Sequence, residues 1–531
     1  MVGKHTPRLP RWGITTGLGA LSGLLYSLSI PRADLSLFAW VCLVPCFYAL
    51  HRTTHQGEAQ PRTWVRRALE LGLAFGVVSG FGRVYWICET LTNYGALAQS
   101  EAIFTTAALI LYLGLYPISF FLLIARFLRF RSPIFAWICA CIWVVLEWAQ
   151  SWVISGFPWE LLGYSQYRNL PLLQTVSLTG IYGVSFLITL FNASFSQVLI
   201  FKKRPLVYVG PPLFLLVLTL TLGHIRLQEL DTSSDEDSVH IGIIQGNVPQ
   251  GAKWKAGRSR RSTEKYVQLT RQLVDGEDED SPPLDLIIFP ETALPFPLHD
   301  PAYDNYLQSI VSLVREIQIP LLVGALESTS EHETLNRAFL IDVEGQVVGS
   351  YDKVHLVPFG EYLPLPWLFE YMQGLTAESG AFAHGRGFSS LPLPLKNGRT
   401  LPFGVFICFE SVFPDITRAL VQEGAQFIVN TTNDAWFGHT AAPHQHLSMA
   451  IVRAVETGRP LLRAANTGIS AVVEPSGKIT QATQLFETAA LSATITPRDE
   501  LTPYVRYGDI FVGLCGLVLA ACALTAFKRQ H

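Results

Sequence analysis

Long apolar runs fill most of the first 230 residues, and one more lies near the end of the chain. A run of about 20 apolar residues is what a membrane-spanning helix needs. Basic residues precede the first run, as in a signal peptide, but no small-residue cleavage site follows it, so we expect a helix there as well. The pattern predicts eight spans, near residues 12–30, 34–51, 69–88, 102–126, 132–153, 173–200, 206–225 and 508–527.

The basic residues of the short loops alternate between the two sides of this predicted bundle. The short loops on one side hold fifteen Lys and Arg residues, and those on the other side hold only Arg32 and Arg168. Cytoplasmic loops are enriched in Lys and Arg, so we expect both termini in the cytoplasm and the long segment after the seventh span outside it. The basic side holds Lys4, Arg8, Arg11, Arg52, Arg62, Arg66, Arg67, Arg126, Arg129, Arg131, Lys202, Lys203, Arg204, Lys528 and Arg529.

Short apolar runs of strand length alternate with helical patterns after the polar linker at 231–239. Several strands are apolar almost throughout, so both faces of the sheet are expected to be covered, as in an α/β sandwich. The predicted domains are a seven-helix region at 1–230, the linker, a domain at 240–497 and the eighth helix at 508–527. The strands are expected at 240–248, 284–289, 321–326, 338–343, 402–408, 427–430, 469–473 and 490–495, and helices at 260–273, 305–316, 414–423 and 446–457.

Composition supports a membrane protein. Hydrophobic residues make up 49% of the chain and charged residues 15%, against about 25% charged residues in soluble domains. Residues 238–500 carry 19 Lys and Arg against 29 Asp and Glu, a net charge of −10, and the rest carries +7, which together give the −3 of the whole chain. These numbers exclude a disordered chain and an ordinary soluble enzyme.

Three segments of the acidic domain carry candidate chemistry. Glu291 follows the apolar strand Ile287-Ile-Phe-Pro, and Lys353 precedes a second carboxylate, Glu361. Cys408 stands where an apolar strand gives way to a helix, two residues before Glu410, and the seven other cysteines lie in apolar runs. A strand-to-helix junction exposes the sulfur, favours a thiolate and leaves backbone donors for an oxyanion.

A carboxylate near that thiol can take its proton, and a lysine can stabilise developing negative charge. Each residue alone also has an ordinary structural explanation: a packed cysteine, a solvated glutamate and a surface lysine. Three such residues at strand ends favour a catalytic group.

In these contexts Glu291, Lys353 and Cys408 resemble the Glu–Lys–Cys triad of the nitrilase, or carbon–nitrogen hydrolase, superfamily, which implies a four-layer αββα sandwich. The membrane part narrows the resemblance to the apolipoprotein N-acyltransferase family over nearly the whole chain. The segments that carry this second resemblance are Glu147-Trp, Gly156-Phe-Pro-Trp159, Gly163-Tyr-Ser-Gln166 and Asn433-Asp-Ala-Trp436-Phe-Gly438.

The resemblance implies that Cys408 is the nucleophile, that Glu291 is the general base and acid, and that Lys353 stabilises the oxyanion. Glu361 and Glu410 become supporting carboxylates close to the triad.

It further implies that Trp254 and Trp436 are tryptophans of mobile loops around the mouth of the site. Two large apolar side chains in loops rich in Gly, Pro and Asn either pack as a satellite core or form a lid at the membrane face. Asn336 lies where the family has a functional asparagine. Phe409 departs from the family pattern, which has tyrosine at that position, and leaves any role for a hydroxyl there in doubt.

The implied reaction is an acyl transfer in two steps. A phospholipid acylates Cys408, and the α-amino group of a lipoprotein's N-terminal diacylglyceryl-cysteine then takes the acyl chain. The expected location is the bacterial inner membrane with a periplasmic catalytic domain, and we expect no cofactor, no metal and no nucleic acid. A shielded apolar site suits this chemistry because water hydrolyses a thioester.

Two other interpretations remain open. A membrane-tethered amidase or nitrilase acting on a small soluble substrate would need only one anchor. A transporter or receptor with an external binding domain would explain Arg83, Glu89 and Glu147, charges in or near the spans. Internal pairing explains those charges equally well.

Overall fold

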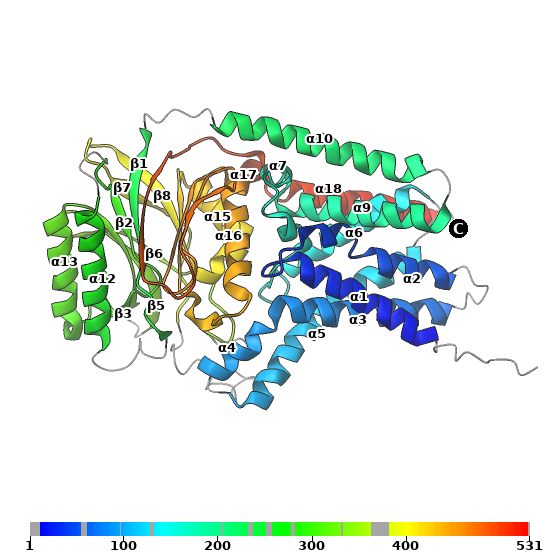
Figure 1. Ribbon diagram of the computed structural model, residues 1–531, viewed down its shortest axis with the longest axis horizontal. Coiled ribbons are helices and arrows are strands. Elements are labelled where there is room, and N and C mark those ends of the chain that lie inside the picture. Colours follow the sequence, from blue (N-terminus) through cyan, green and yellow to red (C-terminus); the bar gives the residue numbers. More distant parts are fainter. Residues whose placement is uncertain are drawn as a thin grey trace, which may run out of the picture.

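The protein consists of a helical bundle and an α/β sandwich that meet end to end (Figure 1). Helix α10 (Pro205–Asp231) ends the first seven predicted spans, and strand β1 (Val239–Gln245) opens the sandwich. The computed structural model describes residues 11–54, 61–95, 97–127, 132–202, 205–231, 237–250, 258–277, 282–330, 333–362 and 382–528.

Most of the long helices of the bundle run along the long axis of the molecule, α4 and α5 run obliquely to it, and the last helix, α18, returns to the bundle after the sandwich (Figure 1). In chain order they are α1 (Arg11–Ser29), η1 (Ser36–Trp40), α2 (Val44–Thr54), α3 (Pro61–Val84), α4 (Trp86–Tyr94), α5 (Gln99–Phe127), α6 (Ile134–Gln150), η2 (Leu162–Gln166), α7 (Leu170–Leu173), α8 (Val176–Thr179), α9 (Ile181–Phe201), α10, α17 (Pro503–Tyr507) and α18 (Ile510–Lys528).

Three helices of the described residues are long and apolar enough to cross a membrane: α5, α9 and α10. Helices α3 and α4 add a fourth span if they are counted together, although they are bent by 49°. Three further predicted spans coincide with shorter apolar helices, at Ser36–Arg52, Ile134–Gln150 and Ile510–Thr525, and the first coincides with the 19-residue helix α1. Membrane-crossing helices are therefore present where the sequence predicts them, and the count of eight stays a prediction.

Small residues bring α3 and α5 together. A Cβ added to Gly72 would lie 2.5 Å from the Cα of Ile118, and one added to Gly76 would lie 2.8 Å from the Cα of Gly114. Larger side chains would force the two backbones apart, and such small-residue contacts are typical of helix pairs in membranes.

The sandwich contains two mixed sheets. One has the order β13-β1-β2-β4-β5-β6 with β3 beside β4, and the other has the order β12-β11-β10-β9-β8-β7. The remaining bounds are β2 (Leu286–Ile288), β3 (Leu294–Pro297), β4 (Leu321–Ser328), β5 (Thr334–Ile341), β6 (Val347–Asp352), β7 (Ser390–Pro394), β8 (Thr400–Ile407), β9 (Ile428–Thr432), β10 (Leu461–Ala465), β11 (Ala471–Val473), β12 (Ile479–Ala482) and β13 (Ala489–Ile495).

Helices cover the outer face of each sheet. Helices α12 (Arg258–Asp275) and α13 (Asp304–Ile317) lie outside the first sheet, and α15 (Pro414–Gln422) and α16 (Ala442–Thr457) lie between the second sheet and the bundle (Figure 1). All residues of β1, β2, β9 and β10 are buried, as parallel strands with two covered faces must be. The predicted α/β sandwich is confirmed.

One core connects the two parts of the molecule. A continuous cluster of buried apolar side chains runs from the bundle, through residues such as Trp159 and Leu187, to Val405 and Val429 of the second sheet. A separate cluster fills the space between the first sheet and helices α12 and α13. The bundle and the second sheet thus share a hydrophobic core.

Candidate active site

Cys408 sits directly after strand β8, at the first residue of the short helix η6 (Cys408–Val412). Its φ angle is +52°, a left-handed conformation that non-glycine residues adopt rarely and mostly at special sites. The side chain is only 7% exposed. The expectation of an exposed sulfur is therefore wrong, because α16 and a loop of the bundle pack against η6 and cover it.

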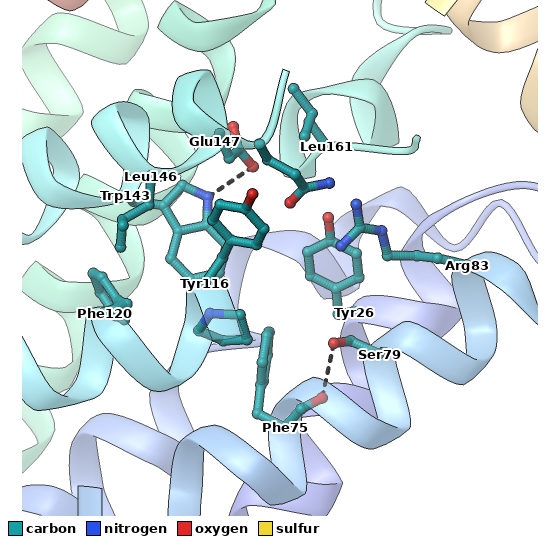
Figure 2. Close-up of a pocket in the computed structure, with 12 residues that line it drawn as sticks. Tyr26, Phe75, Ser79, Arg83, Tyr116, Phe120, Trp143, Leu146, Glu147 and Leu161 are labelled. Carbon is teal, nitrogen blue, oxygen red and sulfur yellow. Dashed lines mark hydrogen bonds between the residues drawn. The ribbon is translucent and has the colours of Figure 1, made fainter. Parts of the chain in front are cut away.

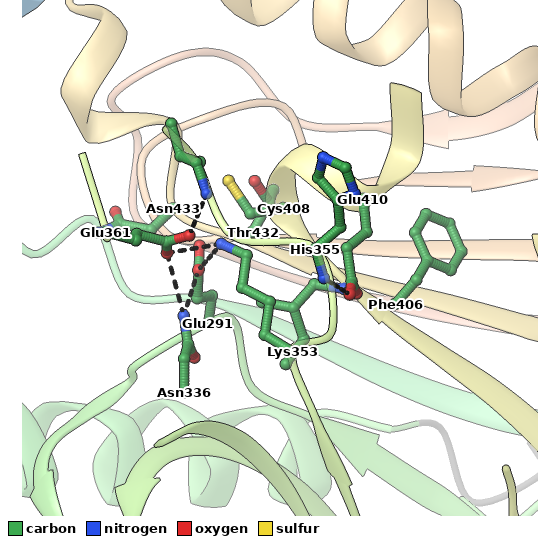
Figure 3. Close-up of polar contacts among 12 residues, drawn as sticks. Glu291, Asn336, Lys353, His355, Glu361, Phe406, Cys408, Glu410, Thr432 and Asn433 are labelled. Carbon is green, nitrogen blue, oxygen red and sulfur yellow. Dashed lines mark hydrogen bonds and ion pairs between the residues drawn. The ribbon is translucent and has the colours of Figure 1, made fainter. Parts of the chain in front are cut away.

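Lys353 forms the centre of a buried ionic group with carboxylates from two loops (Figure 3). Its Nζ donates to Glu361 Oε1 at 2.6 Å and to Glu291 Oε1 at 3.2 Å. Asn336 Nδ2 donates to the same Glu291 oxygen at 2.8 Å, and the N–H of Val357 donates to Glu361 Oε2 at 2.8 Å. Four residues singled out in the sequence thus meet around one ammonium group.

The ionic group is held by residues of the first sheet and its loops, and Cys408 comes from the second sheet. Glu291 follows β2, Lys353 follows β6 and Asn336 lies on β5. Figure 3 shows the sulfur of Cys408 directed toward the same space as the ammonium of Lys353. The two sheets therefore contribute opposite halves of one site.

Electrostatics tie these groups together. Burial opposes the charge of Lys353, but Glu291 and Glu361 outweigh it and raise the pKa of the lysine well above its usual value. Burial and the negative charge of Glu291 raise the pKa of the Cys408 thiol, and Lys353 lowers it. The resting cysteine is thus a neutral thiol, so it needs a base when it reacts.

Glu410 binds the backbone around the site and not the ammonium of Lys353. Its two carboxylate oxygens accept from the N–H groups of Ile407 (2.6 Å), Val354 (2.7 Å) and His355 (3.0 Å), and from the hydroxyl of Tyr351 (3.1 Å). Burial raises the pKa of Glu410 to about 7, against the hydrogen bonds that lower it. Glu410 therefore joins the loop of Lys353 to the end of β8.

Phe409, next to the nucleophile candidate, packs its ring against Phe157 of the bundle loop at 5.9 Å and against Phe413 at 5.2 Å between ring centroids. The contact with Phe157 joins the site to the bundle through apolar surface.

Trp436 lies at the junction of the sandwich and the bundle, in the short helix η7 (Asp434–Phe437). Its half-buried ring meets Tyr94 of α4 edge-on at 5.3 Å, and its carbonyl accepts from Thr90 Oγ1 at 2.9 Å. Trp254 lies outside the described residues. The loop of Trp436 therefore contacts the helix that follows the bend in the bundle.

The charges of the bundle line a separate cavity (Figure 2). Arg83 donates through Nε and Nη2 to the carbonyl of Trp159, at 2.9 and 2.5 Å. Glu147 Oε1 accepts from Trp143 Nε1 and from the N–H of Leu162, both at 2.8 Å. Both charges thus bind groups of the bundle itself, as the pairing interpretation requires.

The sequence interpretation missed a buried polar network directly behind Cys408. The sequence pattern indicates no role for His446, the first residue of the predicted helix at 446–457, and predicts no strand at β10, which carries Arg463. Both side chains are fully buried, together with Asp434. An arginine inside an apolar strand is a signal that points to such a network, since buried charges are paired. Within the described ranges, no grouping of three His, Cys, Asp or Glu side chains suits a metal ion.

A four-layer sandwich that gathers a cysteine, a lysine and glutamates between its sheets defines a carbon–nitrogen hydrolase. The family model described as carbon-nitrogen hydrolase matches residues 241–501, and the model described as apolipoprotein N-acyltransferase N-terminal domain matches residues 22–194. Together with 36% identity to a relative named apolipoprotein N-acyltransferase over 97% of the chain, these matches show that the chain belongs to the apolipoprotein N-acyltransferase family and is an acyltransferase of the bacterial inner membrane.

Relatives named apolipoprotein N-acyltransferase match most of the chain. The one from Geobacter metallireducens is 36% identical and covers 97% of this chain and 95% of its own. The one from Nitrosomonas europaea is 33% identical, with 87% and 89% covered. Among solved structures, the carbon-nitrogen hydrolase from Helicobacter pylori is 16% identical, with a TM-score of 0.38, and covers 49% of this chain and 90% of its own.

Proposed function

We propose that the protein N-acylates lipoproteins by way of a thioester on Cys408. The thiolate attacks the ester carbonyl of a phospholipid, and the lysophospholipid leaves with its alcohol oxygen protonated. The α-amino group of the N-terminal diacylglyceryl-cysteine of a lipoprotein then attacks the thioester, forming an amide and returning the thiol. The observation that carries this proposal is that Cys408, Lys353 and Glu291 converge from two sheets, next to a loop that contacts the bundle.

Each residue has a distinct part in these steps. Glu291 takes the thiol proton, gives it to the leaving oxygen and later removes a proton from the attacking amine. Lys353 stabilises the oxyanion of both tetrahedral intermediates. Glu361 and Asn336 hold Lys353 and Glu291 in place through the hydrogen bonds at 2.6 and 2.8 Å. The role of Lys353 requires its ammonium form, which the negative charges of Glu291 and Glu361 stabilise.

We further propose eight spans, cytoplasmic termini and a periplasmic catalytic domain over residues 240–497. The uneven distribution of basic loop residues supports this orientation, fifteen on one side against Arg32 and Arg168 on the other. Arg32 and Arg168 lie toward the sandwich end of the bundle: Arg32 donates to the carbonyl of His439. Both lipid substrates would then reach the site from the outer leaflet.

The test is an intact-mass measurement after incubation with phospholipid. We expect one added acyl chain on Cys408, removable by hydroxylamine, and its complete loss in Cys408→Ser, because a hydroxyl is far harder to deprotonate than a thiol. Cys522→Ser, in α18, is the matched control and should acylate normally. Wild-type acylation of Cys408→Ser would overturn the proposal.

The loop of Trp436 is proposed to close the site against water. In Trp436→Ala we expect slower acyl transfer and a higher ratio of free fatty acid to amide product at a fixed acceptor concentration. Trp152→Ala changes a tryptophan that is 55% exposed and serves as the control. An unchanged ratio accompanied by lower protein stability would mean that Trp436 only packs.

An amidase acting on a small soluble substrate is the second candidate. It predicts turnover of soluble amides without acyl transfer from phospholipid, and a transporter or receptor predicts neither reaction. The intact-mass measurement separates the acyltransferase from both, and an assay with a soluble amide separates the amidase from a transporter or receptor.

A further inference from the structure

The carbonyl of Cys408 is held by a histidine from the helix that separates the second sheet from the bundle. His446 of α16 has its Nε2 atom 3.0 Å from the Cys408 oxygen. A carbonyl oxygen can only accept a hydrogen bond, so Nε2 carries the hydrogen and donates. The imidazole therefore binds the backbone of the nucleophile and leaves its sulfur free for chemistry.

The other ring nitrogen is fixed by a buried ion pair. His446 Nδ1 lies 2.9 Å from Arg463 Nη2 and 2.9 Å from Asp434 Oδ1, and Arg463 Nη2 lies 2.8 Å from Asp434 Oδ2. All three side chains are buried. Burial and the charge of Arg463 lower the pKa of His446, and Asp434 opposes them. Nδ1 is thus held between a guanidinium and a carboxylate, which keeps Nε2 on the Cys408 carbonyl.

Two aromatic rings hold the plane of the imidazole. Trp159 from the bundle loop stacks on it at 5.8 Å between centroids and an interplanar angle of 23°, and Phe437 meets it edge-on at 5.9 Å. The indole of Trp159 is itself fixed by Gln445 of α16, whose Oε1 accepts from Nε1 at 2.8 Å. The bundle thus contributes to the orientation of His446.

A hydrogen bond to the Cys408 carbonyl fixes more than that oxygen. The peptide group is planar, and its N–H points opposite to its carbonyl, so the N–H of Phe409 is directed away from His446. The same bond helps hold Cys408 at its φ of +52°, a backbone conformation that is unfavourable for a non-glycine residue. Loss of the bond frees the peptide group between Cys408 and Phe409 to rotate.

We infer that His446 is a positioning residue, which orients this peptide group so that the Phe409 N–H donates to the oxyanion opposite Lys353. Asp434 and Arg463 hold His446 in the donating state, and Trp159 couples its plane to the membrane bundle. The inference rests on the proposed function of Cys408 as nucleophile.

The test compares two reactions of Cys408 in the full-length protein. Acylation by phospholipid forms an oxyanion, whereas alkylation by iodoacetamide displaces iodide and forms none. In His446→Leu we expect single-turnover acylation at saturating phospholipid to fall by about 10²-fold, the scale for one oxyanion donor, with the apparent KM for phospholipid and the alkylation rate of Cys408 little changed. His446→Gln, whose Nε2–H can donate to the same carbonyl, should recover most of the acylation rate.

His444→Leu, on the same helix, is the matched control and should acylate at the wild-type rate. Asp434→Asn provides a second test if His446→Leu fails to fold: acylation should fall while alkylation persists. Equal loss of acylation and alkylation, or equal loss in the Leu and Gln variants, would reduce His446 to a packing role and overturn the inference. Acylation that survives Cys408→Ser would instead overturn the proposed function.

Discussion

The bundle and the sandwich handle buried charge in different ways. In the sandwich, the ammonium of Lys353 lies between two carboxylates, and Asp434 lies against Arg463. In the bundle, Arg83 binds a backbone carbonyl, and Glu147 accepts from an indole and a backbone N–H. Lys353 and Asp434 are thus paired with opposite charges, whereas Arg83 and Glu147 are held by neutral groups.

This difference separates reactive charges from structural ones. A charge paired with another can exchange protons within the pair when a substrate arrives, and it shifts the pKa of its neighbours. A charge held by backbone groups fastens one segment to another. Arg83 and Glu147 thus fix the loop from Phe157 to Leu162 over the end of the bundle, and the ionic group of Lys353 is the one that we propose to take part in the chemistry.

The largest expected effect comes from breaking the paired charges. Lys353→Ala and Glu291→Gln should each lower turnover by at least about 10²-fold, the usual scale for one oxyanion donor or one general base. Steady-state kinetics with phospholipid and acceptor should place the loss in kcat, since both charges matter most in the transition state. Lys478→Ala, an exposed lysine, is the control. A rise in the phospholipid KM alone would make these residues headgroup ligands.

A smaller effect, of another kind, is expected from the bundle. Arg83→Gln should destabilise the protein by about 1–3 kcal/mol, because the carbonyl of Trp159 loses a charged donor in a buried site. The kcat of the folded fraction should stay within about threefold of wild type, a change well below that of losing one catalytic donor. Thermal unfolding in detergent measures the first quantity and active-site titration the second. Arg66→Gln, whose side chain is 72% exposed, should change neither.

The smallest change to be measured is a shift in the reactivity of Cys408 with pH. Glu291 raises the pKa of the thiol and Lys353 lowers it. The midpoint of iodoacetamide alkylation at Cys408, followed by peptide mass mapping, should therefore move to lower pH in Glu291→Gln and to higher pH in Lys353→Met. Shifts in the same direction would contradict the geometry of the ionic group.

Local sequence patterns predicted the layers of the sandwich and three members of the site. Apolar strands and amphipathic helices report their own burial, and Glu291, Lys353 and Cys408 stand at strand ends, where side chains of different strands meet. The burial of Cys408 could not be predicted this way, because it depends on α16 and on a loop of the bundle far away in the chain. The same holds for His446, whose partner is a backbone carbonyl that no side-chain pattern reveals.

The shared core of the bundle and the second sheet has a consequence for biogenesis. The face of α16 that would meet water in a free-standing sandwich rests on the bundle, so the sandwich completes its fold only against inserted helices. The chain encodes the parts in that order, with α1 to α10 made before β1, and domains fold as they emerge from the ribosome. Helix α18 comes last and packs against α6. The sandwich and α18 are therefore each synthesised after the helices on which they pack.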